Sequence, residues 1–144
     1  MLDENYQKSL ADVGALKERE LLSQRHRSDG SVKRRVRCVL GIAVAGPARR
    51  FLGNSDPAWV EEATWSPQAM RWDWVIHPEV AKELLDAKGA IEVEANGEGA
   101  SRRVSGEVRI KVPIYGARVE GVIVEGIRHA YDEEAERLRA WIDS

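Results

Sequence analysis

The sequence predicts an α+β fold in which an antiparallel β-sheet built from hairpins precedes one long C-terminal helix. Short segments of alternating apolar and polar residues recur along most of the chain, and this alternation is the period of a β-strand. Residues typical of tight turns separate these segments in pairs. After Pro113 the apolar residues recur every three or four positions instead, which is the period of a helix that buries one face.

The first elements are a short helix and a hairpin. Residues 3 to 11 predict a helix that ends near Gly14, because their apolar side chains stand at helical spacing and glycine commonly ends a helix. Residues 15 to 26 and 31 to 40 predict two paired strands. The connection between them contains Asp29-Gly30, which tolerates the positive φ angles of a tight turn.

The second of these strands has one basic and one apolar face. Alternation places Lys33, Arg35 and Arg37 together, and this basic face is expected in solvent. Arg34 falls on the opposite face. Its apolar neighbours there are Val32, Val36, Cys38 and Leu40.

The middle of the chain predicts an excursion and a second hairpin. Residues 46 to 53 favour a short helix or loop, since a proline near their start and a glycine at their end suit a first helical turn and a stop. Residues 59 to 65 and 70 to 76 then predict two strands around Ser66-Pro67-Gln68. One face of the second strand carries Met70, Trp72, Trp74 and Ile76.

The last elements are a third strand pair and the long helix. Residues 81 to 95 and 101 to 112 predict strands around Asn96-Gly97-Glu98-Gly99, although residues 82 to 88 are also compatible with a helical turn. The helix after Pro113 has a continuous apolar stripe. Its members are Val119, Val122, Ile123, Ile127, Ala130, Tyr131, Leu138 and Ile142.

Composition limits the possible functions. Apolar residues make up 43% of the chain and charged residues 32%, with a net charge of -2, which is typical of a globular protein and names no nucleic-acid or membrane partner. The single cysteine, Cys38, excludes an internal disulfide and suits a reducing compartment. No apolar stretch approaches the ~20 residues that a membrane-spanning helix needs, and the N-terminus does not resemble a secretory signal. We therefore expect one cytoplasmic domain, residues 1 to 144, without a membrane span.

The C-terminal part carries a more specific pattern. It consists of Gly106-Glu-Val-Arg-Ile-Lys-Val-Pro-Ile-Tyr-Gly-Ala-Arg-Val-Glu-Gly-Val-Ile-Val-Glu-Gly126, followed by Glu133-Glu-Ala-Glu136 and Trp141. With the order of elements above, the chain resembles the START-like superfamily, which includes birch-pollen-allergen-like proteins, polyketide cyclases and lipid-transfer domains. It is most similar to an uncharacterised bacterial START-like group. The resemblance implies a helix-grip fold, a curved antiparallel sheet wrapped around the C-terminal helix, with a cavity for a hydrophobic ligand between them.

One departure from that superfamily concerns the sheet edges. START-like proteins open with a strand that is absent here, so the strands at 15 to 26 and 101 to 112 would lack a partner on one side. Proteins usually cover such edges. The sequence therefore predicts a homodimer through the exposed edges or another covering arrangement, and the alternatives are a start codon assigned too late or an N-terminal piece that is not represented.

Several residues are candidates for lining the ligand cavity. Large rings shape apolar pockets, so the sheet is expected to contribute Trp65, Trp72, Trp74 and Met70, and the helix Val119, Val122, Ile123 and Ile127. Arg34 offers planar donors for a carboxylate or phosphate head group. The competing interpretations are that the aromatic residues fill an ordinary core and that Arg34 reaches solvent.

No catalytic motif, cofactor site or metal site is predicted, because the nucleophile elbow, phosphate loop, paired cysteines and zinc helix are all missing from the sequence. His129, Asp132 and Glu133 are more typical of a solvated helix face than of a metal site. The leading hypothesis is a module that binds a small hydrophobic or lipid-like molecule. The alternatives are an enzyme of the polyketide cyclase or dehydratase type and a non-binding oligomerisation or partner-interaction module.

Overall fold

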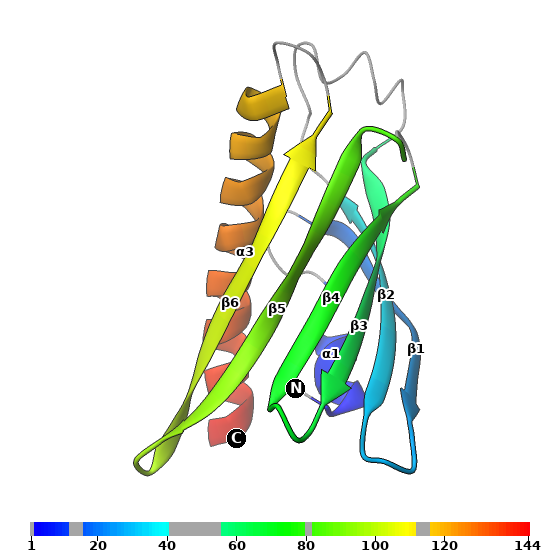
Figure 1. Ribbon diagram of the computed structural model, residues 1–144. Coiled ribbons are helices and arrows are strands. Elements are labelled where there is room, and N and C mark those ends of the chain that lie inside the picture. Colours follow the sequence, from blue (N-terminus) through cyan, green and yellow to red (C-terminus); the bar gives the residue numbers. More distant parts are fainter. Residues whose placement is uncertain (1, 12–15, 41–55, 80–81, 112–115) are drawn as a thin grey trace.

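The computed structural model describes residues 2–11, 16–40, 56–79, 82–111 and 116–144. In these residues a short helix comes first, a run of strands follows, and a long helix comes last (Figure 1). They are α1 (Glu4–Ser9), β1 (Leu16–His26), β2 (Val32–Leu40), β3 (Ala58–Ser66), β4 (Arg71–Pro78), β5 (Leu85–Asn96), β6 (Gly99–Ile110) and α3 (Gly116–Asp143). The predicted excursion at residues 46 to 53 lies outside the described residues, as does Gly14.

The strands form one six-stranded sheet in the order β1-β2-β3-β4-β5-β6, and every neighbouring pair is antiparallel. The curved antiparallel sheet with a C-terminal helix along one face confirms the predicted α+β class (Figure 1). The helix-grip arrangement stays a prediction. Strands that follow one another in the sequence are therefore also neighbours in the sheet, so no connection has to cross over another strand. The outermost strands are β1 and β6, the two predicted edges.

The turns follow the predicted chemistry in two hairpins and depart from it in one. Gly30 and Gly97 have positive φ angles of 83° and 58°, as the tight turns require. The β3–β4 turn instead places Met70 in this region, with a φ of 48°, and β4 begins only at Arg71. The prediction that Met70 begins the strand and shares one of its faces with Trp72, Trp74 and Ile76 is therefore wrong. Its side chain lies in the turn and is 47% exposed.

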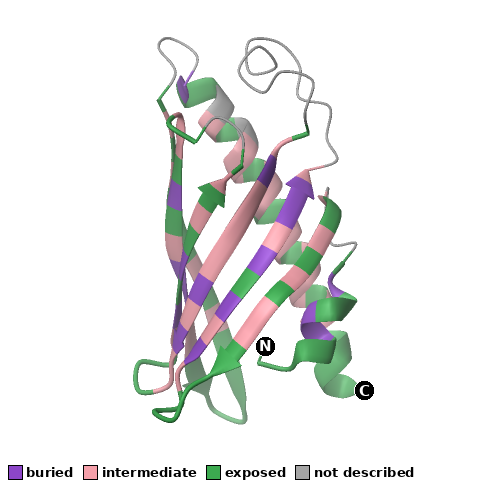
Figure 2. Ribbon diagram, turned by 90° about the vertical axis from the view of Figure 1, so that its right-hand side faces the viewer, coloured by how far each residue is buried: buried purple, intermediate pink, exposed green. Residues whose placement is uncertain are grey.

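The helix α1 joins the β1 edge of the sheet to α3. Asp3 caps α1 by accepting hydrogen bonds from the backbone N–H groups of Asn5 and Tyr6 at 2.7 and 3.1 Å. Arg19 of β1 donates to the backbone and side-chain oxygens of Gln7 at 2.7 and 2.8 Å. On its other side, the Tyr6 ring lies 5.7 Å from the ring of Trp141. Figure 2 shows α1 beside the C-terminal end of α3.

The opposite edge of the sheet is tied directly to α3. Arg102 of β6 forms an ion pair with Glu134 at 3.1 Å. At the start of the helix, the carboxylate of Glu120 accepts a hydrogen bond from the backbone N–H of Ile110 at 2.7 Å. The sheet, α1 and α3 thus surround a common interior. We call the side of the sheet that faces α3 the inner face.

Candidate functional site

The inner face is built from rows of residues that are paired in register across β2 to β6. The tryptophan row is large and apolar, and consists of Val32, Trp65, Trp72, Ile91 and Val104. The central row lies next to it and consists of Arg34, Ala63, Trp74, Gly89 and Gly106. The third row, which we call the glutamate row, consists of Val36, Glu61, Ile76, Ala87 and Val108.

The central row is a trough because three of its members have little or no side chain. The indole of Trp74 lies over the two glycines: a Cβ at Gly106 would stand 2.8 Å from Cζ2 of Trp74, and a Cβ at Gly89 would overlap the same ring and the carbonyl oxygen of Ser105. Glycine is therefore required there for the indole to lie against the sheet. Ala63 remains the small residue between Arg34 and Trp74.

Arg34 is buried among the tryptophans. It is 5% exposed, and its guanidinium carbon lies 4.1 Å from the centre of the Trp72 ring, which is cation–π geometry. Burial lowers the pKa of Arg34, while the negative charge of Glu61 acts in the opposite direction. The sequence prediction that Arg34 faces the apolar side of β2 is confirmed, and it does not reach solvent.

Glu61 and Tyr131 share the interior with Arg34. Glu61 is diagonal to Arg34 in the register of β2 and β3, and desolvation of its carboxyl group raises its pKa despite the positive charges of Arg34 and Arg19. Tyr131 comes from α3 and packs against the tryptophan cluster. Burial, followed by the charge of Glu61, raises the pKa of its hydroxyl well above the ordinary value. Arg34 is buried, whereas Glu61 and Tyr131 are half-buried as whole residues. We call these three residues the buried polar cluster.

A second set of polar groups lies between this cluster and α1. The side chains of Arg102 and Glu134 are 14% and 18% exposed, so their ion pair is largely removed from water. Burial, and then the charge of Glu134, raises the pKa of Tyr6 to about 12. The interior therefore holds hydrogen-bonding groups along a path from β2 to the junction of α1 and α3.

The predicted ligand residues differ in how far they are buried and in whether their side chains are described. Trp65, Trp72 and Trp74 lie together in the buried core, at 8%, 1% and 7% exposure. Ile123 and Ile127 are half-buried on α3, while the side chains of Val119 and Val122 lie outside the described residues. The predicted role of these residues in ligand binding stays a prediction.

Sequence reasoning missed Glu61 and Tyr131 as site residues. A signal for Glu61 was present, because Trp59, Glu61, Ala63 and Trp65 alternate along one strand and put the acidic residue on the aromatic face. Tyr131 was assigned only to the apolar stripe of the helix. Its contribution of a buried hydroxyl depends on how α3 docks, which no local pattern shows.

Cys38 is buried on the inner side of β2. Burial raises the pKa of its thiol to about 12, so the thiol stays protonated at neutral pH and is a poor nucleophile.

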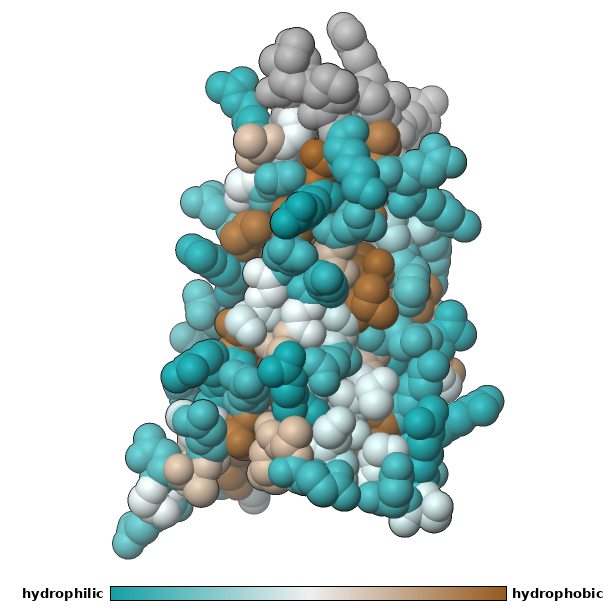
Figure 3. Space-filling view, viewed as in Figure 1, coloured by the Kyte–Doolittle hydropathy of each residue, from teal (hydrophilic) through white to brown (hydrophobic). Residues whose placement is uncertain are grey.

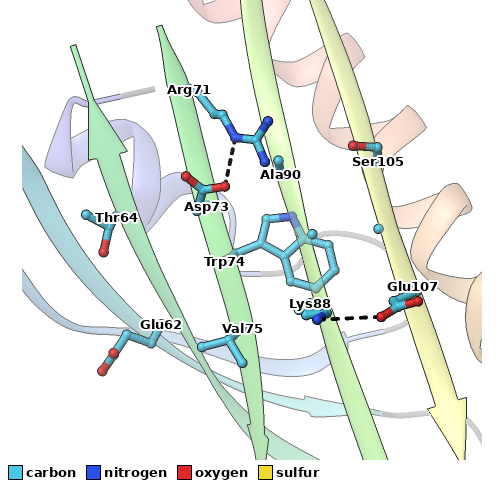
Figure 4. A pocket seen from close by; sticks show the side chains of 12 residues that line it. Glu62, Thr64, Arg71, Asp73, Trp74, Val75, Lys88, Ala90, Ser105 and Glu107 are labelled. Atoms are coloured by element: carbon cyan, nitrogen blue, oxygen red, sulfur yellow. Dashed lines mark hydrogen bonds and ion pairs between the residues drawn. The ribbon is translucent and has the colours of Figure 1, made fainter. Parts of the chain in front are cut away.

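One hollow lies on the outer side of the sheet, away from α3. It measures about 670 Å³ and is lined mainly by outward residues of β3 to β6, among them Arg71, Asp73, Lys88 and Glu107 (Figure 4). Trp74, Gly89 and Gly106 also line it. Its charged side chains are paired, Arg71 with Asp73 at 2.7 Å and Lys88 with Glu107 at 3.7 Å. Figure 3 shows this outer side covered largely by hydrophilic side chains. The hollow is therefore not the predicted cavity between the sheet and the helix.

The basic face of β2 is neutralised by acidic neighbours. Lys33 pairs with Glu62 at 3.1 Å, and Arg37 pairs with Glu79 at 2.7 Å. In the described part of the chain, no group of three or more metal-ligating side chains comes together. Among those same residues, no helix is long and apolar enough to cross a membrane. The cytoplasmic location stays a prediction.

Comparisons with known proteins place the chain in a family without assigning it an activity. Its fold is similar to the crystal structure of TTHA0849 from Thermus thermophilus, with a TM-score of 0.62 and 19% sequence identity over 96% of this chain and 84% of that chain. At this identity the likeness shows the fold alone. No curated protein matches the sequence. A family model described as protein of unknown function (DUF2505) matches residues 1–142, and the chain therefore belongs to the DUF2505 family.

Proposed function

We propose that the chain has the helix-grip arrangement of START-like proteins and binds a small hydrophobic or lipid-like molecule between the inner face of the sheet and α3. The observation that carries this proposal is the buried polar cluster within an aromatic surface. Arginine and glutamate are rarely buried unless they are paired. A core needs no such groups, since apolar residues of similar volume often give equal or greater stability.

The chemistry of the inner face suits an amphipathic ligand. Trp65, Trp72 and the apolar residues beside them offer contact surface for a hydrocarbon or ring system. The buried polar cluster offers donors and an acceptor at one place on that surface. Ionisable groups whose pKa values are shifted by burial and by specific charge partners are typical of functional sites.

Native mass spectrometry of the full chain tests this proposal. We expect a non-covalent hydrophobic adduct, or uptake of a neutral probe such as Nile red, that is lost or strongly weakened in Arg34→Met. Arg37→Met is the matched control because it removes the same group from the outer face of the same strand, and it should retain binding. Absence of any adduct and of probe uptake in the unmodified chain would contradict the proposal.

The same cluster favours a second candidate, an enzyme of the polyketide cyclase or dehydratase type. A carboxyl group with a raised pKa that acts electrostatically on a tyrosine hydroxyl is suited to proton transfer. In this case Glu61→Gln would still bind a hydrophobic substrate analogue but would lose turnover. Equal turnover in Glu61→Gln and in Glu62→Gln, the outward neighbour, would exclude Glu61 as the proton-transfer group.

We also propose that the chain forms a homodimer through its sheet edges, which would cover strands that pair on one side only. In the described sheet, β1 and β6 are each hydrogen-bonded to a single neighbouring strand. Sedimentation equilibrium should give twice the mass of the chain. A stable monomer over a wide concentration range would contradict the dimer, and a dimer that takes up no ligand would favour an oligomerisation module.

A further inference from the structure

The two edge strands of the sheet differ in how well they are protected against the addition of a further strand. The register of β1 with β2 has two irregularities, at residues 16–18 and 21–23, and α1 is tied to β1 through Arg19. Bulges and covering segments are common ways of blocking a sheet edge. The register of β6 with β5 runs without a shift through all 12 residues of β6. The β6 edge is therefore the more regular and the more open of the two.

Two hydrogen bonds at the end of β6 show which of its backbone groups point away from β5. The N–H of Lys111 donates to the carbonyl oxygen of Leu84, just before β5, at 2.7 Å. Successive N–H groups of a strand point in opposite directions, so the N–H of Ile110 points outward, and Glu120 of α3 accepts its hydrogen bond at 2.7 Å. The same alternation puts the N–H and C=O of every second residue before Ile110 on the open edge. Gly106 is one of them, and because glycine has no side chain, its exposed surface is backbone.

The side chains on the outer side of this edge favour an acidic partner. β6 carries three arginines and one glutamate, Glu107. Arg102 pairs with Glu134 on the inner side, whereas Arg103 and Arg109 are exposed on the outer side. Within the described part of the chain, Arg103 has no ion pair, and the ion pair of Arg109 is a contact of 3.5 Å with Glu107. Opposite charges that face each other on adjacent strands attract, and like charges are unfavourable.

The inner side of the same edge favours apolar residues in a partner. Val104 and Val108 flank Gly106 on this side and are half-buried. The helix α3 runs along it, since Glu120 and Glu134 join the helix to β6 near both ends of the strand (Figure 1). A strand added to β6 would therefore rest its inward side chains beside the valines and α3. A second copy docked through its own β6 would bring another α3 to this place, whereas an extended segment brings no helix.

We propose that the β6 edge binds an extended acidic segment of a partner protein as an additional antiparallel strand. The backbone of every second β6 residue supplies the hydrogen bonds, acidic residues of the partner face Arg103 and Arg109, and its alternate apolar residues face inward. This interaction is independent of the hydrophobic ligand proposed above. It leaves the β1 edge for the proposed homodimer.

A designed peptide tests the proposal on the unmodified protein by fluorescence anisotropy. Its sequence is Glu-Val-Lys-Val-Thr-Val-Glu-Val-Thr, and its fourth residue is designed to pair with Gly106. In the antiparallel direction, this register places the glutamates opposite Arg103 and Arg109. It also places the lysine opposite Glu107. The control peptide exchanges glutamate and lysine at these positions, and we expect it to bind at least about ten-fold more weakly, because each attractive pair becomes repulsive.

Methylation of single peptide nitrogens tests whether the backbone of the edge takes part. The N–H of the fourth peptide residue would donate to the carbonyl oxygen of Gly106, so its methylation should weaken binding at least about ten-fold. The N–H of the fifth residue points away from β6. Its methylation is the matched control and should leave binding unchanged.

A charge reversal on the protein tests the side-chain contacts. Arg103→Glu should weaken binding of the first peptide and strengthen binding of the control peptide, because the residue opposite position 103 then has the wrong or the right charge. Arg25→Glu makes the same exchange on the β1 edge and should change neither affinity. Both positions are exposed, so we expect both variants to fold, which circular dichroism verifies.

The possible outcomes separate this proposal from the others. Equal binding of the two peptides, or binding that survives methylation of the fourth residue, would overturn it. Loss of binding in Arg25→Glu but not in Arg103→Glu would also overturn it. A chain that binds neither peptide and whose dimer is lost in Arg103→Glu would show that a second copy occupies the β6 edge instead. None of these outcomes affects the uptake of a hydrophobic adduct, which native mass spectrometry measures separately.

Discussion

The inner and outer faces of the sheet hold their charged side chains in different ways, and β2 shows both. On the outer face, Lys33 and Arg37 pair with carboxylates of neighbouring segments at 3.1 and 2.7 Å and remain partly in water. Arg34 lies between them in the sequence but points inward and stacks on Trp72. Water screens the outer pairs, so each contributes little, whereas the inner charge depends on Glu61 and the aromatic ring. The same residue type thus has two energetic roles within one strand.

The largest expected effect comes from removing the inner charge. Arg34→Ala leaves the buried carboxyl of Glu61 without its main positive neighbour and also removes a side chain from the core, so we expect a loss of about 3–5 kcal/mol in the free energy of unfolding. Arg35→Ala, on the outer face of the same strand, should change it little. Urea denaturation measures both. Similar losses for the two variants would show that the faces do not differ as described.

The second effect concerns the trough beneath Trp74. Gly89→Ala places a Cβ against the indole and against the carbonyl oxygen of Ser105, and such overpacking should destabilise the fold by about 1–3 kcal/mol. Gly121→Ala is the control: no atom lies within 4 Å of its Cβ position, and alanine favours a helix by about 0.5–1 kcal/mol over glycine. Thermal unfolding should therefore shift in opposite directions. A stabilising Gly89→Ala would contradict the packing of the indole on the glycines.

The third effect is the pH dependence of stability that the inward carboxyl group of Glu61 contributes. Because burial raises the pKa of Glu61 in the folded chain, the unfolded chain releases this proton first as the pH rises. As the pH rises from 4.5, the ordinary pKa of this carboxyl group, to its raised pKa in the folded chain, the contribution of Glu61 to the free energy of unfolding decreases. Above that pH range the contribution stays low. Inward groups that act on Glu61 are Arg34, Arg19 and Glu134, with Tyr131 facing it from α3.

Glu61→Gln has no proton to release at this position, so its free energy of unfolding relative to the unmodified chain should increase as the pH rises through this window. Denaturation at several pH values measures the difference. Glu62→Gln, the outward neighbour on β3, is the control. A difference for Glu61→Gln that is flat or decreases with pH would show that the carboxyl is not desolvated.

The smallest effect is expected on the outer face. Lys88→Ala removes an exposed ion pair with Glu107, whose atoms are 3.7 Å apart, and should cost less than about 1 kcal/mol. Added salt should reduce even this difference, because the charges are screened. A larger cost in urea denaturation would mean that the outer hollow contributes more to stability than its exposed pairs suggest.

Much of the fold followed from local patterns. Asp29-Gly30 and the glycines near residue 97 marked two hairpins because tight turns require positive φ angles, and the change of period after Pro113 marked α3. Met70 was misplaced because alternation alone cannot tell the last residue of a turn from the first residue of a strand. The residues 41–55, where a further excursion was predicted, lie outside the described structure.

The sequence by itself determined which face of each strand is apolar, and therefore that Arg34 lies on the apolar face of its strand. Side-chain direction in a strand has a period of two residues, so this information is local. Only the tertiary structure decided that Glu61 and Tyr131 join Arg34, and that the Trp74 indole rests on two glycines of other strands. Those contacts depend on the register across the sheet and on the docking of α3. Both are set by packing between residues far apart in the sequence, so local sequence patterns do not reveal them.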